Sequence, residues 1–307
     1  MQFSITLLGT SSATPQPGRF TSAQVLNAQE KLYLIDCGEG AQMRMTEYQV
    51  RRSKISQIFI SHLHGDHFYG LMGLLTSYAL NDRKDPIDIF SPPGLQEIVR
   101  VMSLPQGGGA FPFPLRFHVV DTTKHQLIFE DHILGVYSIP LAHRIPTSGY
   151  LFIEKERSRT ILSEKIELYD IPYQKIPGIK AGDDLQMPDG RVIPNAELTT
   201  DPPKPRSYAY CSETRCKEDI VPIIQGVDLL YHEATFMQSE LQNAMDTMHS
   251  TAAEAATIAQ NAGAGQLILG HFSTRYREVE PLIAEARAVF PDTLGGEDGM
   301  TIEVPIH

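Results

Sequence analysis

Short apolar runs rich in β-branched and aromatic residues recur along the chain and predict strands. Between several of these runs, apolar residues recur at the spacing of an amphipathic helix. Strands interleaved with helices indicate a mixed α/β fold. The expected strands span residues 3–8, 31–35, 57–61, 88–90, 136–139, 208–211, 228–231 and 266–269, and the expected helices span residues 40–48, 68–80, 94–103, 252–260 and 280–289.

The helix expected from residue 252 has recognisable start and stop signals. Thr251 precedes Glu254 at the spacing of a capping box, in which each side chain bonds to the backbone N–H of the other residue. Gly263 stands where a helix commonly ends on a left-handed residue. The pattern therefore predicts a helix with well-defined ends.

From about residue 154 to residue 206 the regular patterns stop, because proline and glycine recur too often for long helices or strands. Within this segment, Met187-Pro188-Asp189-Gly190-Arg191 is typical of a hairpin turn. The segment carries nine Lys or Arg and ten Asp or Glu, so it is nearly neutral in a chain of net charge −11. We interpret residues 154–206 as an arm inserted into a single domain that spans residues 1–307.

The composition is ordinary for a soluble protein, with 42% hydrophobic and 21% charged residues. No apolar run approaches the roughly eighteen residues of a membrane helix, and the N-terminus lacks the basic lead of a secretion signal, so we expect a cytoplasmic protein without a membrane anchor. The three cysteines lack the spacing of a disulfide framework, which favours buried, reduced thiols. The net charge of −11 means that a nucleic-acid substrate must meet local basic patches or metal ions.

Four potential metal ligands fall within the hexapeptide His62-Leu63-His64-Gly65-Asp66-His67, directly after the strand expected at residues 57–61. Imidazole nitrogen and carboxylate oxygen are ligands for zinc, manganese and similar divalent ions. In extended chain, His62 and His64 point the same way and can chelate one ion, whereas the adjacent Asp66 and His67 diverge and suit a second. The hexapeptide therefore indicates a site for two metal ions.

Six residues cannot enclose two ions, so we expect further ligands at the ends of other strands. His143, Glu213 and His271 each stand just past an expected strand. Ligands gathered from several strand ends predict an active site on one rim of a sheet sandwich. Asp36 also ends an expected strand, where it suits either a turn or a hydrogen bond to a ligand histidine.

Motifs spread over nearly the whole chain extend this pattern: LLGTSSATP at 7–15, DCGEGAQMRM at 36–45, SHLHGDHFYGLMGLL at 61–75, PLAHR at 140–144, YHEATF at 231–236, MHST at 248–251 and HFSTRY at 271–276. With them the chain resembles the metallo-β-lactamase superfamily, and within it the ribonuclease Z branch of tRNA 3′-processing endonucleases. The HxHxDH element specifies only the superfamily. HEAT followed by HST and HFSxRY is far more specific to the tRNA-processing branch.

The resemblance implies an αββα sandwich, usually dimeric, in which residues 154–206 form a flexible arm that grips the tRNA elbow. It implies two zinc ions, or manganese or another divalent transition metal in their place. It makes His62, His64 and His143 the ligands of one ion and Asp66, His67 and His271 those of the other, with Glu213 bridging them. The family usually has aspartate where this chain has Glu213, and proline where it has Met72.

The implied reaction removes the 3′ trailer from precursor tRNA, leaving a 3′-hydroxyl on the tRNA and a 5′-phosphate on the trailer. Asp66 is expected to orient the attacking water and accept its proton. His249, just before the capped helix, is the candidate acid for the leaving 3′-oxygen, with Glu233 of HEAT holding its imidazole.

Two groups of basic residues suit RNA phosphates. Arg275 and Ser273 follow the ligand His271, and a guanidinium matches phosphate oxygens in a bidentate way. The basic stretch Arg44, Arg51, Arg52 and Lys54 suits RNA backbone or, equally, a solvated surface.

Two alternative functions remain open at this point. One is a small-molecule phosphodiesterase or arylsulfatase on the same metal scaffold, which has little need of an inserted arm. The other is a tRNA-binding protein whose metal centre is impaired by Glu213. Deletion of the arm tests the first alternative, and metal content tests the second.

Overall fold

The chain is described by a computed structural model over residues 2–104 and 111–306. Two compact units make up the chain. The larger unit comprises residues up to 153 together with 206–304, and the smaller unit comprises residues 154–205 with the C-terminal residues from 305. The larger unit holds all the candidate ligands.

One seven-stranded sheet of the larger unit is built mostly from the N-terminal half of the chain. Strand β2 pairs antiparallel with both β1 and β3, and β3, β4, β5 and β6 run parallel. The strand order is β18-β1-β2-β3-β4-β5-β6. The strands are β1 (Phe3–Gly9), β2 (Ala23–Ala28), β3 (Lys31–Cys37), β4 (Ile55–Phe59), β5 (Ile87–Ser91), β6 (Leu115–Val119) and β18 (Thr301–Glu303).

The second seven-stranded sheet has the order β17-β16-β15-β14-β9-β8-β7. Strands β14 to β17 run parallel, whereas β9 pairs with β14 antiparallel. Parallel strands place their carboxyl ends at the same edge of the sheet, which is where such sheets carry ligand sites. The strands are β7 (Leu127–Glu130), β8 (Leu134–Pro140), β9 (Ser148–Glu154), β14 (Ser207–Cys211), β15 (Leu229–Glu233), β16 (Gln266–Gly270) and β17 (Thr293–Gly295).

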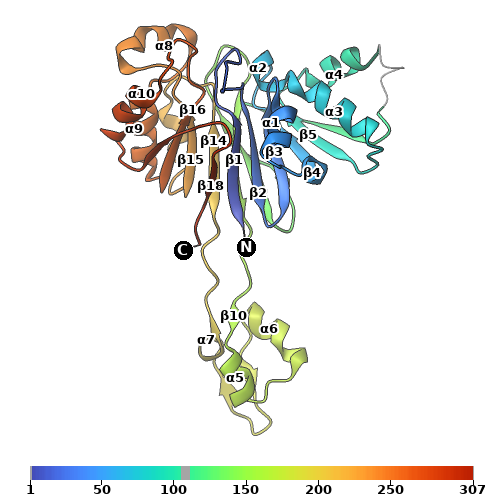
Figure 1. The fold of residues 1–307 in the computed structure, drawn as a ribbon. Coiled ribbons are helices and arrows are strands. Elements are labelled where there is room, and N and C mark those ends of the chain that lie inside the picture. The colour runs from blue at the N-terminus through green and yellow to red at the C-terminus, as the bar shows by residue number, and fades with distance from the viewer. Residues whose placement is uncertain (1, 105–110, 307) are drawn as a thin grey trace. The chain divides into compact units, whose positions relative to one another are not determined.

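The two sheets face each other and carry helices on their outer faces (Figure 1). An aromatic core that includes Phe59, Tyr150 and Phe152 fills the space between the sheets, and separate apolar clusters join each sheet to its helices. The expected αββα sandwich is therefore confirmed. The helices are α1 (Ala41–Glu47), α2 (Gly65–Phe68), α3 (Gly70–Leu80), α4 (Leu95–Ser103), α8 (Leu241–Thr247), α9 (Ala252–Ala262) and α10 (Glu280–Arg287), with 3-10 turns η1 (Arg52–Lys54), η4 (Glu218–Ile220) and η5 (Gln238–Glu240).

The smaller unit has its own apolar cluster, which contains Ile171, Ile179, Leu185, Ile193 and Leu198. Its limits, 154–205, lie close to those of the arm expected from the sequence. The expected hairpin is present, since β11 pairs with β12 across a turn closed by the bond from Met187 N–H to Arg191 O. The elements are β10 (Thr160–Ile161), α5 (Ser163–Leu168), η3 (Tyr173–Lys175), α6 (Ile176–Ala181), β11 (Leu185–Gln186), β12 (Val192–Ile193), α7 (Asn195–Leu198) and β13 (Thr199–Thr200).

Every strand and helix expected from the sequence is present, with bounds shifted by a few residues, and the helix expected over 68–80 is split into α2 and α3 at Tyr69. The capping box of Thr251 and Glu254 is formed, and Gly263 ends α9 in the left-handed conformation. Strand β2 escaped sequence analysis because the polar Gln24 and Asn27 interrupt its apolar pattern. Gln24 is nevertheless buried, because its side chain accepts a hydrogen bond from the Tyr208 hydroxyl of the opposite sheet.

The three cysteines are free thiols, with Cys37 and Cys211 buried and Cys216 half-buried. Burial raises the pKa of the Cys211 thiol to about 12, so it stays protonated and unreactive at neutral pH. Across residues 2–104 and 111–306, none of the helices combines the length and apolar character that a bilayer crossing needs.

Candidate active site

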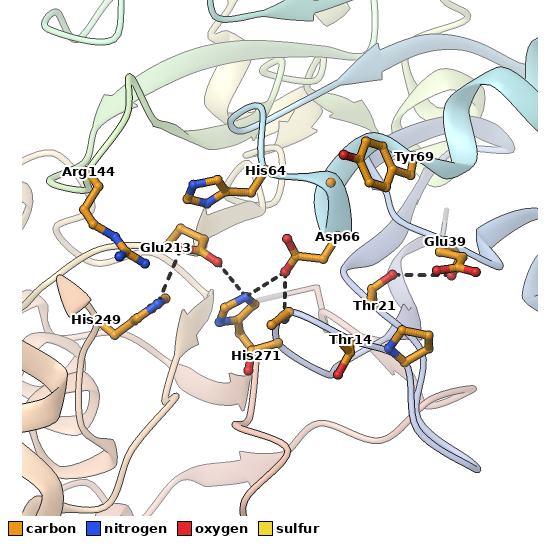
Figure 2. A pocket seen from close by; sticks show the side chains of 14 residues that line it. Thr14, Thr21, Glu39, His64, Asp66, Tyr69, Arg144, Glu213, His249 and His271 are labelled. Carbon is orange, nitrogen blue, oxygen red and sulfur yellow. Dashed lines mark hydrogen bonds and ion pairs between the residues drawn. The ribbon is translucent and has the colours of Figure 1, made fainter.

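Loops at the ends of four strands bring the candidate ligands to one rim of the sandwich. His62, His64, Asp66 and His67 follow β4, and single ligands follow β8, β14 and β16. Figure 2 shows His64, Asp66, Glu213 and His271 pointing into a common cavity from these different segments. The strands that supply single ligands are β8 for His143, β14 for Glu213 and β16 for His271.

The ligand atoms form two groups, each with its atoms within 4.8 Å of one another. In the first group, His62 Nε2 lies 3.0 Å from His64 Nδ1, and His143 Nε2 lies 2.8 Å from an oxygen of Glu213. The second group joins Glu213 to Asp66, His67 and His271. The structure therefore brings all seven sequence-predicted ligands together.

Glu213 belongs to both groups and directs one carboxylate oxygen to each. Its Oε2 lies 2.8 Å from His143 Nε2, and its Oε1 lies 2.8 Å from His271 Nε2. Burial acts to raise the pKa of Glu213, but His271, His143 and His67 together lower it well below the usual value. The carboxylate is thus ionised at the centre of the site.

The backbone at Glu213 is left-handed, with φ of 61°. Such a conformation costs a non-glycine residue about 1–2 kcal/mol, and strain of this kind persists where the surroundings fix it. Asp36 and His271 share this backbone conformation, with φ of 54° and 56°. Three residues of the site are therefore held in orientations that an unconstrained strand end would seldom adopt.

Asp36 accepts hydrogen bonds from four buried donors. Its Oδ2 accepts from His67 Nδ1 at 2.7 Å, from the Tyr210 hydroxyl at 2.7 Å and from the Ser61 hydroxyl at 2.8 Å. Its Oδ1 accepts from Ser61 N–H. Of the two roles that the sequence left open for Asp36, the structure supports the hydrogen bond to a ligand histidine. The bond fixes the ring of His67 so that Nε2 faces the second group.

The other ligands are oriented by backbone and hydroxyl groups. His143 Nδ1 donates to Met248 O over 3.1 Å, and His271 Nδ1 lies 3.0 Å from the Thr235 hydroxyl. Asp66 Oδ2 accepts a hydrogen bond from Ala13 N–H over 2.8 Å. The rings of His143 and His271 are thereby turned so that Nε2 faces the cluster, and their second nitrogen is held by a hydrogen bond, as is usual for metal-ligating histidines.

The donor set fits divalent cations. His143 Nε2 and Glu213 Oε2 are buried 2.8 Å apart, yet neither makes a well-oriented hydrogen bond to any described residue. Buried polar atoms are otherwise paired in nearly all proteins, so these two are the kind of atoms that ligate a cation. One group offers three imidazoles and the Glu213 carboxylate, and the other offers two imidazoles and the carboxylates of Asp66 and Glu213. Both match the nitrogen and oxygen ligands of zinc and manganese.

Glu233, the last residue of β15, holds His249 beside the cluster. Its Oε1 lies 2.9 Å from His249 Nδ1 and also accepts from Thr214 N–H over 2.7 Å. Burial acts to lower the pKa of His249, but Glu233 and then Glu213 raise it by more, so the net pKa is above that of an ordinary histidine. His249 Nε2 lies 3.7 Å from Glu213 Oε2 and faces the active-site cavity.

The active-site cavity has a volume of about 470 Å³ and is open to solvent. Thr21, Glu39, Tyr69 and Arg144 line it together with the ligands (Figure 2). Arg144 was not singled out by sequence analysis, although its position directly after a ligand histidine is a signal that points to it.

The basic residues singled out in the sequence lie elsewhere. Arg275 pairs with Glu240 over 2.8 Å and stacks on Phe236, and neither Arg275 nor Ser273 is among the residues lining the cavity. Arg44 is buried, where it stacks on Phe20 and Tyr48 and reaches Asp298. The guanidinium of Arg51 and the ammonium of Lys54 both pair with Glu30. The stretch is therefore not the continuous, unpaired basic surface that RNA contact would require.

Comparison with known proteins agrees with this geometry. A protein named Ribonuclease Z from Parabacteroides distasonis is 44% identical over 98% of this chain and 99% of its own length, and one from Porphyromonas gingivalis is 45% identical over similar shares. The chain belongs to the ribonuclease Z family. A family model described as Anti-Pycsar protein Apyc1 also matches residues 3–111.

Two solved structures superpose on this ribonuclease Z family member over nearly its whole length. The crystal structure of human tRNase Z, short form, superposes with a TM-score of 0.71 at 28% identity, covering 99% of this chain and 100% of the human one. YhfI from Bacillus subtilis, a metallo-β-lactamase fold protein, gives a TM-score of 0.70 at 17% identity, covering 99% and 100% of the two chains. The fold is therefore that of the metallo-β-lactamase superfamily.

Proposed function

We propose that this member of the ribonuclease Z family is a metal-dependent endoribonuclease that removes the 3′ trailer from precursor tRNA. The names of the relatives support the reaction, and the fold supports its hydrolytic class. The observation that carries the proposal is Glu213 lying between two groups of ligand atoms, with His249 beside it. Two cation sites with an adjacent proton donor match the needs of phosphodiester hydrolysis.

Two divalent ions, for which we propose zinc, would be held by the seven ligand side chains. His62, His64 and His143 would ligate one ion, Asp66, His67 and His271 the other, and Glu213 both. Such ions, when bound, would lower the pKa of water at the site and offset the negative charge of the phosphate.

The protein side chains manage the protons of the reaction. Asp66 has one oxygen tied to Ala13 N–H, and its carboxylate lines the cavity, where it accepts the proton of the attacking water. His249 donates a proton to the leaving 3′-oxygen, and Glu233 keeps Nδ1 of its ring protonated and Nε2 directed at the cavity.

The atoms balance over one hydrolytic step. The water oxygen forms a bond to phosphorus as the bond from phosphorus to the 3′-oxygen breaks. One proton moves from the water to Asp66, and one moves from His249 to the 3′-oxygen. The products are a tRNA with a 3′-hydroxyl and a trailer with a 5′-phosphate, and transfer of the proton from Asp66 back to His249, directly or through solvent, restores the enzyme.

We assign residues 154–206 the role of a tRNA-binding arm. Its apolar cluster shows that the segment has a packed structure of its own, and its nearly neutral charge makes it less repulsive to RNA than the rest of this acidic chain. We also infer a homodimer and a cytoplasmic location. Light scattering coupled to size exclusion tests the dimer.

The decisive experiment is incubation with a precursor tRNA that carries a 3′ trailer, with and without a chelator, followed by mapping of the cut. The proposal expects a single cut at the 3′ side of the tRNA body that chelator abolishes and added zinc or manganese restores. The metal-loaded protein could instead fail to cut the precursor, or could bind tRNA without cleaving it while holding one ion or none per chain. Either result would favour a tRNA-binding protein with an impaired metal centre.

Replacing residues 155–205 by a short Gly-Ser linker separates tRNA processing from hydrolysis of small esters. The proposal expects loss of precursor cleavage while hydrolysis of bis(p-nitrophenyl) phosphate is kept. Equal loss of both activities, with metal content unchanged, would count against a specific role of the arm in binding tRNA. Full retention of both would show that precursor cleavage does not need the arm. A wild-type protein that hydrolyses the small ester but does not cut the precursor would favour a small-molecule phosphodiesterase or arylsulfatase.

A further inference from the structure

Two exposed arginines flank His249 on the rim of the active site. Arg144 directly follows the ligand His143, and Arg215 stands two residues after Glu213. Neither guanidinium has an ion pair or a hydrogen bond to any of the residues that the structure describes, whereas Arg44 and Arg275 are both paired with carboxylates. Unpaired cations beside a cluster of ionised carboxylates are available to an anionic ligand.

Arg144 faces the active-site cavity. Among the described residues lining this cavity it is the one with a permanent positive charge, against the carboxylates of Glu39, Asp66 and Glu213. Figure 2 shows its guanidinium extending toward the side of the cavity where Glu213 and His249 lie. A phosphate held at the ligand cluster would therefore meet Arg144.

Arg215 faces a second cavity, also of about 470 Å³, on the other side of His249. Arg215 and Lys217 supply its positive charge, Glu218, Asp219 and Glu254 its carboxylates, and Met245 an apolar surface. His249 lines both cavities. Met245 is 60% exposed, so it offers an apolar surface on which a nucleobase can rest. The Glu254 carboxylate is already engaged in capping α9, which limits its repulsion of an RNA strand.

The loops that carry the two arginines are tied to each other. Arg215 N–H donates to Ala142 O over 3.0 Å, and Ala142 N–H donates to the Thr214 hydroxyl over 3.1 Å. Both loops also carry ligands of the cluster. The two Cα positions are consequently fixed relative to His143 and Glu213, even though the side chains project into solvent.

We propose that Arg144 and Arg215 hold two successive phosphates of the RNA strand, with Arg144 on the phosphate that is cut and Arg215 on the phosphate just before it. This inference rests on the proposed function, because His249 sets the direction of the strand. His249 faces the leaving 3′-oxygen, so the cavity beyond it receives the nucleotide that carries that oxygen, which is the last one the tRNA retains. A guanidinium suits each phosphate because it donates two parallel hydrogen bonds.

Binding of two product-like tRNAs to the metal-loaded protein tests the assignment without any need for cleavage. One tRNA ends at the cut site with a 3′-hydroxyl, and the other ends there with a 3′-phosphate that stands in for the phosphate being cut. For the 3′-hydroxyl tRNA, Arg215→Ala is expected to raise Kd about tenfold and Arg144→Ala to leave it unchanged. For the 3′-phosphate tRNA, both substitutions are expected to raise Kd.

The salt dependence of binding gives a second readout. Each lost phosphate contact should reduce the slope of log K against log salt by about 0.7, and Arg→Lys at either position should restore most of that slope. A neutral methylphosphonate in place of the phosphate before the last retained nucleotide should weaken wild-type binding and leave the Arg215→Ala variant unaffected. Arg100→Ala, at a guanidinium paired with Glu97, is the matched control and should change neither Kd nor slope.

Equal Kd values for wild type and both variants with both tRNAs would overturn the assignment. So would a methylphosphonate that weakens wild type and the Arg215→Ala variant alike. Both arginines are exposed, so thermal melts should confirm intact folding of the variants. Failure of the proposed function would appear separately, as a wild-type enzyme that does not cut precursor tRNA.

Discussion

Replacing Glu233 by glutamine tests whether His249 acts as the acid for the leaving 3′-oxygen. The Glu233 carboxylate is fully buried and accepts hydrogen bonds from four groups. Oε1 meets His249 Nδ1 at 2.9 Å and Thr214 N at 2.7 Å, and Oε2 meets the Thr235 hydroxyl at 2.6 Å and Ser250 N at 3.2 Å. Glutamine keeps the shape of this side chain but removes its charge and two of its acceptor positions.

The geometry sets the expected size of the effect. Glutamine is best placed with its oxygen toward His249 and Thr214 and its amide toward Thr235, whose hydroxyl can turn to accept. Ser250 N–H then faces the amide and loses its acceptor, which costs about 1–3 kcal/mol for a buried donor. Loss of charge from the remaining hydrogen bonds adds about 1 kcal/mol, so we expect Glu233→Gln to lower the free energy of unfolding by about 2–4 kcal/mol.

The effect on catalysis should depend on the leaving group. With precursor tRNA, whose 3′-oxygen leaves poorly unless protonated, kcat should fall by roughly 10²–10⁴. With bis(p-nitrophenyl) phosphate, whose leaving group needs no proton, kcat should change little. His249→Ala should give the same split, and the double variant should lose no more than His249→Ala alone, because Glu233 acts through His249.

An equal fall of kcat on both substrates, with metal content unchanged, would refute this reasoning. It would mean that Glu233 and His249 serve the ligand cluster or the phosphate rather than the leaving group. A large loss of bound metal in Glu233→Gln would point the same way, since Glu233 also contacts Thr235, which lies against the ligand His271.

Three further predictions test the surroundings of the site. Asp36→Asn, which removes the carboxylate from His67 Nδ1, should weaken metal binding by about 10- to 100-fold in a chelator competition, whereas Asp189→Asn on the exposed hairpin of the arm should not. Removing metal with EDTA should lower Tm, and a metal concentration of 100 Kd should restore about 2.7 kcal/mol per site. For Asp131, burial acts to raise its pKa, but Lys31, Tyr33 and backbone donors lower it by more. The ionised Asp131 therefore stabilises the fold at neutral pH, and this stabilisation is lost as the pH falls through the pKa of the folded protein. The difference in unfolding free energy between wild type and Asp131→Asn should be largest near pH 7 and should shrink below about pH 4.

The sequence predicted which side chains lie together because their signals are local. His62, His64, Asp66 and His67 lie within six residues, so their spacing alone indicates two ions. His143, Glu213 and His271 could be placed because each stands just past a recognisable strand, and strand ends of one sheet edge meet. The unusual backbone of Asp36, Glu213 and His271 was not foreseeable, since none is glycine and only the folded surroundings impose the left-handed conformation.

Side chains whose partners are distant in sequence were not predictable. Arg275 was expected at a substrate phosphate, and the structure shows its guanidinium paired with Glu240 from the turn η5, a contact that the sequence did not indicate. Arg44 was grouped with surface cations, but Phe20, Tyr48 and Asp298 enclose it. In each case a carboxylate or ring from another segment decides whether the cation is free, and sequence spacing carries no such information.

The claim on which the account depends is that seven side chains from four segments hold a pair of divalent cations. Anomalous diffraction from crystals of the zinc-loaded protein, with metal content measured on the same sample, tests it most directly. The account predicts two ions per chain, one among His62, His64, His143 and Glu213 and one among Asp66, His67, Glu213 and His271. A single ion, no ion, or ions bound away from Glu213 would contradict it.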